Sequence, residues 1–251
     1  FYVGKGSTYP DVHGAVGILF EQASSRGHLQ DSINGPLSFL STIDNQFTTS
    51  LSTLRGAVEN KQRLQKWQQQ FFRDSQKLAA EDPVQGYLLT EGSDQSRLQD
   101  LLLLLAQHQI KAYALTEDFQ INGKSFAAGS SYFVPVEQNQ YNLIKAAFNT
   151  DTNFRDNTFY DVSAWTLPHA FNIEYSESRK IPAGLSKQPW QAEAVVAPEL
   201  TAGAYAYALR WTDQQAPLLL QKLLQQGLKV RSASKAFSAK TSDGEYSPRS
   251  M

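Results

Sequence analysis

One carboxylate, Glu21, stands out in this sequence because of the residues that precede it. The six residues from Ala15 to Phe20 carry no polar side chain, and the run lies between Gly14 and the turn-forming residues 24–27. A short apolar run bounded by turn residues predicts a buried strand. In open α/β sheets, ligands and catalytic groups collect at the carboxyl ends of strands. Glu21 is therefore a candidate catalytic carboxylate, and the alternative is a side chain that only marks the exit of the strand into solvent.

The segment around Glu21 resembles the last part of the catalytic domain of zinc carboxypeptidases, the carboxypeptidase A-like metallopeptidases. The resemblance rests on Tyr2, on residues 4–11 (GKGSTYPD) and on residues 14–22 (GAVGILFEQ). In that family a mobile tyrosine precedes a loop rich in Gly and Ser, and the next strand ends in the glutamate that activates the zinc-bound water. The resemblance implies that Glu21 is the general base, that Tyr2 contacts the substrate, and that the parent enzyme uses zinc to remove C-terminal residues from peptides.

The zinc ligands of that family are missing from this sequence. A catalytic zinc needs three protein ligands, which the family supplies as His-x-x-Glu and a later His, all upstream of the tyrosine. None of the four histidines here is followed three residues later by Glu: His13, His28, His108 and His169. His28 has Asp31 at that spacing, but after Glu21, which reverses the family's order. We therefore expect a C-terminal part of a longer peptidase, inactive alone, that meets its peptide substrate through the missing N-terminal part.

Composition excludes several functional classes. The chain of 251 residues is 41% hydrophobic and 19% charged, with a formal net charge of -1, which argues against nucleic acid or an anionic membrane as partner. No apolar run approaches the length of a membrane span. The chain contains no cysteine, which excludes disulfides and thiol nucleophiles. This absence fits either side of a cell membrane, and the resemblance implies a periplasmic or secreted protein.

Residues 1–82 are predicted to be the C-terminal part of the peptidase domain, a mixed sheet followed by one long helix. The helical pattern extends from Leu37 to Ala80, with Gly56 as a place for a bend, and Asp82-Pro83 ends it. We expect an apolar stripe along this helix to pack against the sheet as core: Phe47, Leu51, Leu54, Val58, Leu64, Trp67 and Phe71.

Residues 83–251 alternate between strand and helix patterns. Strands are predicted at 87–89, 110–115 and 131–136, helices at 94–107 and 140–149, and a tight turn at Asn122-Gly123. A partial repeat follows, with strands at 205–209 and 228–231 around a helix at 218–224. This order predicts a mostly parallel sheet with helices on its faces. The repeat lacks its last strand, so we expect the C-terminus to be truncated, because an unpaired sheet edge would otherwise remain.

These residues resemble the class I glutamine amidotransferase-like domain that follows the peptidase in a bacterial subgroup of the family. The resemblance implies a doubly wound, flavodoxin-like parallel sheet. Because that chemistry uses a cysteine and the chain has none, the domain is expected to be catalytically silent. It is then a binding or scaffolding module that holds the peptidase near a polymer such as cell-wall peptide, or that forms a homo-oligomer.

A second place where a site could lie is the aromatic-rich stretch 156–169. It contains Asp161, Ser163 and His169, the residue types of a catalytic triad. Triads depend on geometry and not on nearness in sequence, and no Gly-x-Ser-x-Gly elbow surrounds Ser163. The alternatives are a surface that binds carbohydrate or peptide, and a structural connector.

Overall fold

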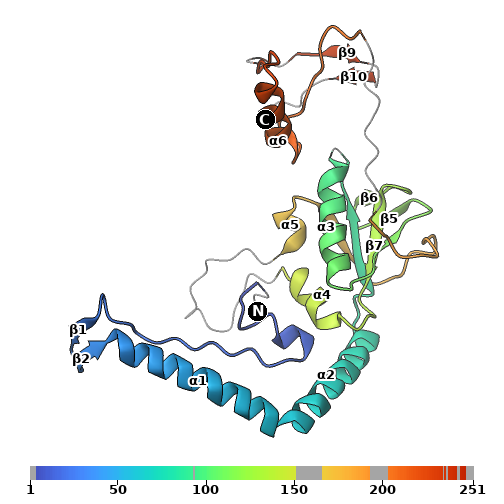
Figure 1. Cartoon of the computed structure of the whole chain (residues 1–251). Coiled ribbons are helices and arrows are strands. Elements are labelled where there is room, and N and C mark those ends of the chain that lie inside the picture. Colours follow the sequence, from blue (N-terminus) through green and yellow to red (C-terminus); the bar gives the residue numbers. More distant parts are fainter. Residues whose placement is uncertain are drawn as a thin grey trace. The chain divides into compact units, whose positions relative to one another are not determined.

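The computed structural model describes residues 4–92, 94–150, 166–192, 203–233, 235, 237–241 and 244–246. The chain is a mixed α/β protein, as predicted (Figure 1). It divides into two compact units. Unit 1 comprises Phe1–Gly86, Pro135–Ala170 and Arg179–Ile181, and unit 2 comprises Tyr87–Val134, Phe171–Ser178 and Pro182–Met251. The predicted domain boundary after residue 82 stays a prediction.

Unit 1 is mainly helical. Its elements are the 3-10 helix η1 (Asp11–His13), the strands β1 (Leu29–Ser32) and β2 (Gly35–Ser38), and the helices α1 (Phe39–Glu59), α2 (Lys61–Glu81), α4 (Tyr141–Ala147) and α5 (Leu167–Ala170). The strands β1 and β2 form an antiparallel hairpin that leads directly into α1. The Ser38 hydroxyl caps α1 by accepting a hydrogen bond from the Ser41 N–H at 3.0 Å.

The single long helix expected from the sequence is two helices, α1 and α2, that meet at Asn60 (Figure 1). Asn60 leaves the helical conformation with φ -100 and ψ 12. Its side-chain amide donates to the Gly56 carbonyl at 2.9 Å, so it competes with the backbone for that acceptor. The break therefore lies four residues after the glycine at which we predicted a bend. The predicted end of the helical region is confirmed, since α2 ends at Glu81.

The prediction that the apolar stripe forms a core is wrong for most of its members. Six of the seven residues are 37% to 76% exposed: Phe47, Leu51, Leu54, Val58, Leu64 and Trp67. Phe71 is the exception, because its ring lies against Gly14. Periodicity fixes which face of a helix is apolar, but burial requires a second surface, and the described residues of unit 1 supply none for this face.

The C-terminal end of α2 is tied to α4 by the buried carboxylate of Asp82. The Tyr141 hydroxyl donates to it at 2.9 Å, the Val84 N–H at 2.8 Å, and Lys145 Nζ lies 3.0 Å away. About two turns earlier in α2, the Asn142 amide donates to the Ser75 hydroxyl at 2.7 Å. Burial opposes ionisation of Asp82, but these hydrogen bonds and the Lys145 charge together hold its pKa below the ordinary value.

Unit 2 contains a four-stranded sheet in the order β4-β7-β3-β8. Its elements are β3 (Gly86–Thr90), α3 (Gln95–Gln107), β4 (Tyr113–Ala114), β5 (Phe119–Ile121), β6 (Lys124–Phe126), β7 (Ser131–Pro135), β8 (Glu174–Ser178), α6 (Ala216–Gln225), β9 (Ala239–Thr241) and β10 (Gly244–Tyr246). The core is formed by the sheet and by the inner face of α3. Four leucines of that face are at most 2% exposed: Leu98, Leu101, Leu102 and Leu105.

The prediction of a doubly wound parallel sheet is wrong at β7. This strand pairs antiparallel with β4. It is also antiparallel to β3, because the Val136 N–H donates to the Gln85 carbonyl at one end and the Ser131 hydroxyl to Thr90 Oγ1 at the other. The reason lies in the connections. A parallel neighbour needs a long crossover, usually a helix, as α3 provides between β3 and β4, whereas a hairpin without a helix joins β4 to β7.

That connecting hairpin is built from β5 and β6 and turns at Asn122-Gly123, as predicted. Both turn residues have positive φ, 54° and 74°. This is the backbone that a two-residue hairpin turn requires and that Asn-Gly supplies at low cost. The hairpin packs against the sheet, where its residue Phe126 joins Leu88, Leu115 and Phe133 in one buried cluster.

The C-terminal repeat is only partly present. Its helix is confirmed as α6, but residues 205–209 and 228–231 are exposed and lie in no strand. Of the first copy, the strand predicted at 110–115 is reduced to the two residues of β4. Over the described residues, no helix combines the length and apolarity needed to cross a membrane.

We predict that Asp82→Asn lowers the free energy of unfolding by about 1–3 kcal/mol at pH 7, because Lys145 and Tyr141 lose a charged acceptor. The wild-type stability gained from Asp82 is present above its unfolded-state pKa and is lost as pH falls through the lower folded-state pKa. The difference between the two proteins, measured by urea unfolding, should therefore shrink below pH 4 or so.

The control for this prediction is Asp74→Asn, which removes an exposed carboxylate of the same helix that accepts a hydrogen bond from the Gln70 amide. It should change the unfolding free energy by less than about 0.5 kcal/mol. Equal effects of the two substitutions would contradict a role for Asp82 in joining α2 to α4.

Candidate functional site

Glu21 lies in an extended segment without regular structure, between η1 and β1, and its side chain is exposed. The strand predicted at Ala15–Phe20 is therefore wrong. Its four large apolar residues are 45% to 64% exposed: Val16, Ile18, Leu19 and Phe20. A strand needs a neighbour to satisfy its backbone groups, and the segment's hydrogen bonds are made with the preceding loop instead.

The loop that precedes this segment folds back on it tightly. The Ala15 N–H donates to the Pro10 carbonyl at 3.0 Å, and the Gly17 N–H to the Asp11 carboxylate at 2.9 Å. Gly14 adopts φ +69°, and a Cβ atom there would come within 2.7 Å of the Phe71 ring. A glycine is required at this position both for the backbone conformation and for the approach to α2. The loop thus fixes the start of the segment that carries Glu21.

Three other residues named from the sequence cannot be placed. Tyr2, Asp161 and Ser163 lie outside the described residues. The structure therefore does not test the substrate contact expected of Tyr2 or the triad considered for the stretch 156–169. Its last member, His169, belongs to the single-turn helix α5.

The histidines do not assemble a zinc site. His13 lies against the Tyr9 ring, with the ring centroids 4.7 Å apart. His108 follows α3, and its Nδ1 is 2.8 Å from the Leu104 carbonyl. His28 is exposed in the loop before β1. Among the described residues, no three His, Asp or Glu side chains come close enough together to hold a metal ion. The side chains that the structure describes thus do not fit the zinc that the resemblance implies.

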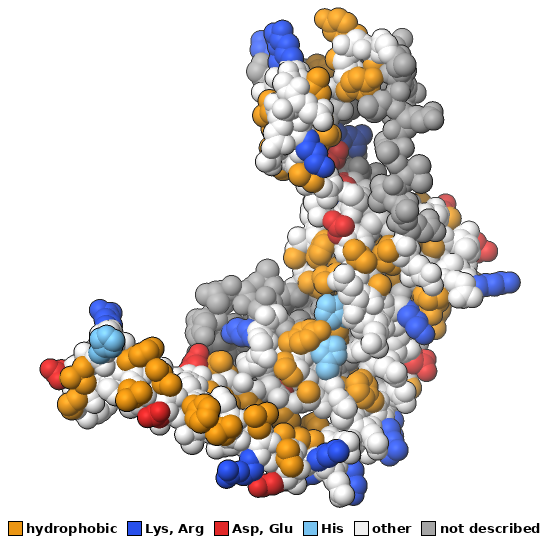
Figure 2. All heavy atoms as spheres, in the orientation of Figure 1, with side chains coloured by type: hydrophobic (Ala, Val, Ile, Leu, Met, Phe, Trp, Pro, Cys, Tyr) orange, Lys and Arg blue, Asp and Glu red, His pale blue; other side chains and the backbone are white. Residues whose placement is uncertain are grey.

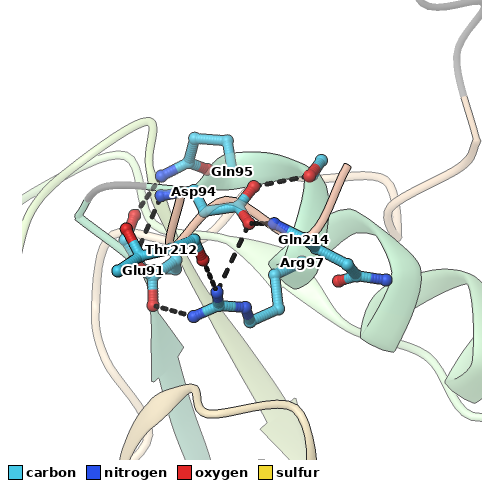
Figure 3. A network of polar contacts seen from close by, with 7 residues as sticks. Glu91, Asp94, Gln95, Arg97, Thr212 and Gln214 are labelled. Carbon is cyan, nitrogen blue, oxygen red and sulfur yellow. Dashed lines mark hydrogen bonds and ion pairs between the residues drawn. The ribbon is translucent and has the colours of Figure 1, made fainter. Parts of the chain in front are cut away.

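A cluster of charged and amide side chains lies where β3 ends and α3 begins, and sequence reasoning missed it (Figure 3). Arg97 is its centre. Its guanidinium lies 3.9 Å from Glu91 and 3.5 Å from Asp94, and it donates to the Thr212 carbonyl at 2.7 Å. The Asp94 carboxylate accepts from the Gln214 N–H at 2.7 Å and from the Ser96 hydroxyl.

This cluster connects two parts of unit 2 that are 115 to 120 residues apart in sequence. The Gln214 amide adds a hydrogen bond to Asp100 at 2.6 Å. The spacing of Asp94 and Arg97 at the start of a helix suggests a local ion pair, but no sequence pattern connects them to residues 212–214. Because Arg97 and Asp94 hydrogen-bond to residues 212 and 214, the cluster holds the segment before α6 against α3, and we call it the clamp.

The pKa values of Asp94 and of its neighbour Asp213 are shifted in opposite directions. Burial opposes ionisation of Asp94, but hydrogen bonds from Ser96, Gln214 and Arg97 and the Arg97 charge hold its pKa below the ordinary value. Burial and the Asp94 charge raise the pKa of Asp213, against the attraction of Arg210 and Arg97. Two acidic groups that share one arginine thus divide into one that favours the charged form and one that resists it.

The comparisons with known proteins add no family to these observations. No family model, curated protein or solved structure matches this chain.

We predict that Asp213→Asn stabilises the protein at neutral pH. Because the pKa of Asp213 is raised in the folded state, its ionised side chain lowers the free energy of unfolding. This destabilisation is absent below the unfolded-state pKa and is complete once pH has risen through the folded-state pKa. The variant should therefore unfold at a higher urea concentration than wild type at pH 7 and at the same concentration near pH 3, which is below the ordinary pKa of an aspartate at about 3.9. Glu137→Gln, at an exposed position, is the control and should unfold at the wild-type urea concentration at both pH values. A destabilised Asp213→Asn protein at pH 7 would contradict the assignment.

Proposed function

We propose that this chain contributes the general base, Glu21, to a zinc carboxypeptidase-type reaction that removes C-terminal residues from peptides. The observation that carries the proposal is the order of residues from Tyr2 to Gln22, which resembles the family. Glu21 itself is an exposed carboxylate, so it is accessible to a substrate, and it directly follows a segment of exposed apolar side chains.

In this proposal Glu21 accepts a proton from the attacking water and later donates it to the amine that leaves. A positioned carboxylate can fill both roles, and such proton transfers typically contribute about 10² to 10⁴ in rate. Tyr2 is proposed to contact the peptide. The zinc, when bound, polarises water and carbonyl, and its ligands are proposed to come from polypeptide outside the described residues, because no three His, Asp or Glu side chains among those residues come close enough together to hold a metal ion.

We expect the chain alone to bind no stoichiometric zinc and to release no amino acid from peptides. In the product of the complete reading frame that encodes these residues, Glu21→Gln should lower kcat for release of the C-terminal residue by about 10² or more. Its zinc content, measured by mass spectrometry of the metal, should stay unchanged.

Glu59→Gln is the matched control, since it removes an exposed carboxylate at the end of α1. It should retain the wild-type rate. A Glu21→Gln enzyme as active as the control would overturn the assignment of the general base, and zinc bound by the isolated chain would overturn the need for outside ligands.

A second proposal concerns residues 83–251, as a non-catalytic, amidotransferase-like module that binds a polymer of the periplasm or cell surface. Two observations favour a role without catalysis. The chain has no cysteine, and the charged cluster at the end of β3 is used to hold residues 212–214. Because β7 pairs antiparallel with β4, this sheet differs from the fully parallel sheet that the amidotransferase resemblance implies.

The second proposal predicts that the chain sediments with insoluble peptidoglycan and not with cellulose. Retention should persist in Glu21→Gln, because the binding surface belongs to the other part of the chain. Equal recovery with both polymers, or with neither, would contradict binding to cell-wall peptide.

A further inference from the structure

Among the described residues of unit 1, one face of α1 is a long uncovered apolar surface. Figure 2 shows hydrophobic side chains gathered along the helix that Figure 1 labels α1. Six of them are 47% to 76% exposed: Leu40, Ile43, Phe47, Leu51, Leu54 and Val58. We call these six residues the α1 stripe. Since residues of an α-helix advance by about 100° each, all six lie within about 40° of Phe47 around the helix axis.

The chain's own contacts with α1 are made on the opposite side. Thr42 is buried, and its hydroxyl donates to the Ala23 carbonyl at 3.4 Å. Thr42 is about 140° around the helix from Phe47, and the partly buried Thr49 about 160°. The segment that follows Glu21 therefore packs on the side of α1 opposite the α1 stripe and leaves the stripe uncovered.

The area of the α1 stripe matches what a protein partner covers. Large apolar side chains offer on the order of 150–200 Å² each when fully exposed, so the stripe offers roughly 600 Å². The largest apolar patch of a typical monomer is about 300–600 Å², and one partner in a stable interface contributes about 800 Å². The α1 stripe is thus at the upper limit for a surface left in water.

The α1 stripe is also complementary to itself. Suppose that a second α1 lies antiparallel on the stripe, with the two-fold axis crossing the interface at the level of Thr49 along the helix. Leu40 then lies opposite Val58 of the second copy, and Phe47 lies opposite its Leu51. Such a contact uses the same surface on both copies, and it closes at two. The spacing of three and four residues along the stripe gives each helix the ridge that packs into the groove of the other.

Charge selects the antiparallel arrangement. Asp44 and Arg55 are both exposed and lie on the same flank of the stripe, about 60° and 80° from Phe47. In an antiparallel pair of helices equal flanks meet, and the same two-fold axis brings Asp44 opposite Arg55 of the second copy. In a parallel pair this flank would instead meet the neutral one that carries Ser50 and Ala57.

We propose that α1 is a homodimerisation helix, which packs its stripe antiparallel against the α1 stripe of a second copy of this chain, with Asp44 paired to Arg55 across the interface. The proposal does not depend on the role of Glu21. Because about 1,200 Å² buried by two stripes is at the lower end of specific interfaces, we expect a dissociation constant in the micromolar range.

Sedimentation equilibrium of the full chain over a concentration series tests the proposal. Wild type should pass from monomer to dimer, and Leu54→Asp should stay monomeric with an unchanged far-UV circular dichroism spectrum. Asp44→Arg and Arg55→Asp should each weaken the dimer about tenfold, and the double variant should restore it. Ser52→Arg, on α1 but away from the stripe, is the control and should dimerise like wild type.

Because the chain has no cysteine, a single introduced thiol reports the geometry of the dimer. Ser50→Cys lies beside the two-fold axis and should form an intermolecular disulfide on mild oxidation, whereas Ser52→Cys, on the outer side of α1, should not. A wild-type protein that stays monomeric at every concentration would overturn the proposal. A dimer that persists in Leu54→Asp would also overturn it, and so would a double charge variant no tighter than the single ones.

Discussion

Burial of apolar surface distinguishes the core around α3, β3 and β7 in unit 2 from the two uncovered apolar faces of unit 1. In unit 2 the inner face of α3 and the central strands β3 and β7 bury their own large side chains almost completely, and Leu88, Leu98 and Phe133 have no exposed surface. At about 25 cal/mol per Å² of apolar area, this core is the main favourable contribution to the fold of unit 2. In unit 1 the apolar faces of the segment Val16–Phe20 and of α1 are left in contact with solvent.

Polar contacts then fix elements that apolar packing alone would leave loosely placed. Asp82 joins the end of α2 to α4, and Arg97 and Asp94 join the start of α3 to the residues before α6. Each uses a charged group largely withdrawn from water, with several hydrogen bonds that satisfy it, which is the condition under which such a group stabilises a fold. Both contacts join residues far apart in the sequence, which is why pattern analysis does not find them.

Local patterns predicted the elements that depend on neighbouring residues. The helix after Asp94 follows from the spacing of its leucines, and the Asn122-Gly123 hairpin and the end of α2 before Pro83 follow from turn conformation and from the missing N–H of proline. Predictions failed where the outcome depends on a distant partner. The run Ala15–Phe20 has the composition of a strand but no strand beside it among the described residues, and β7 entered the sheet between β3 and β4 because its hairpin connection reverses the chain. The candidate site shares this difficulty. Glu21 was identified from its place after an apolar run, yet its environment depends on what covers that run.

The central claim is that this chain buries the apolar side chains of α3, β3 and β7 but not the run that leads to Glu21. Hydrogen–deuterium exchange of the full chain, followed peptide by peptide, measures this directly. Amides of residues 18–20 should exchange at rates close to those of an unfolded peptide, while amides of β3 and β7 should be protected by several orders of magnitude. Protection of residues 18–20 equal to that of β3 would contradict the claim, because it would show that the run is a buried strand of this chain.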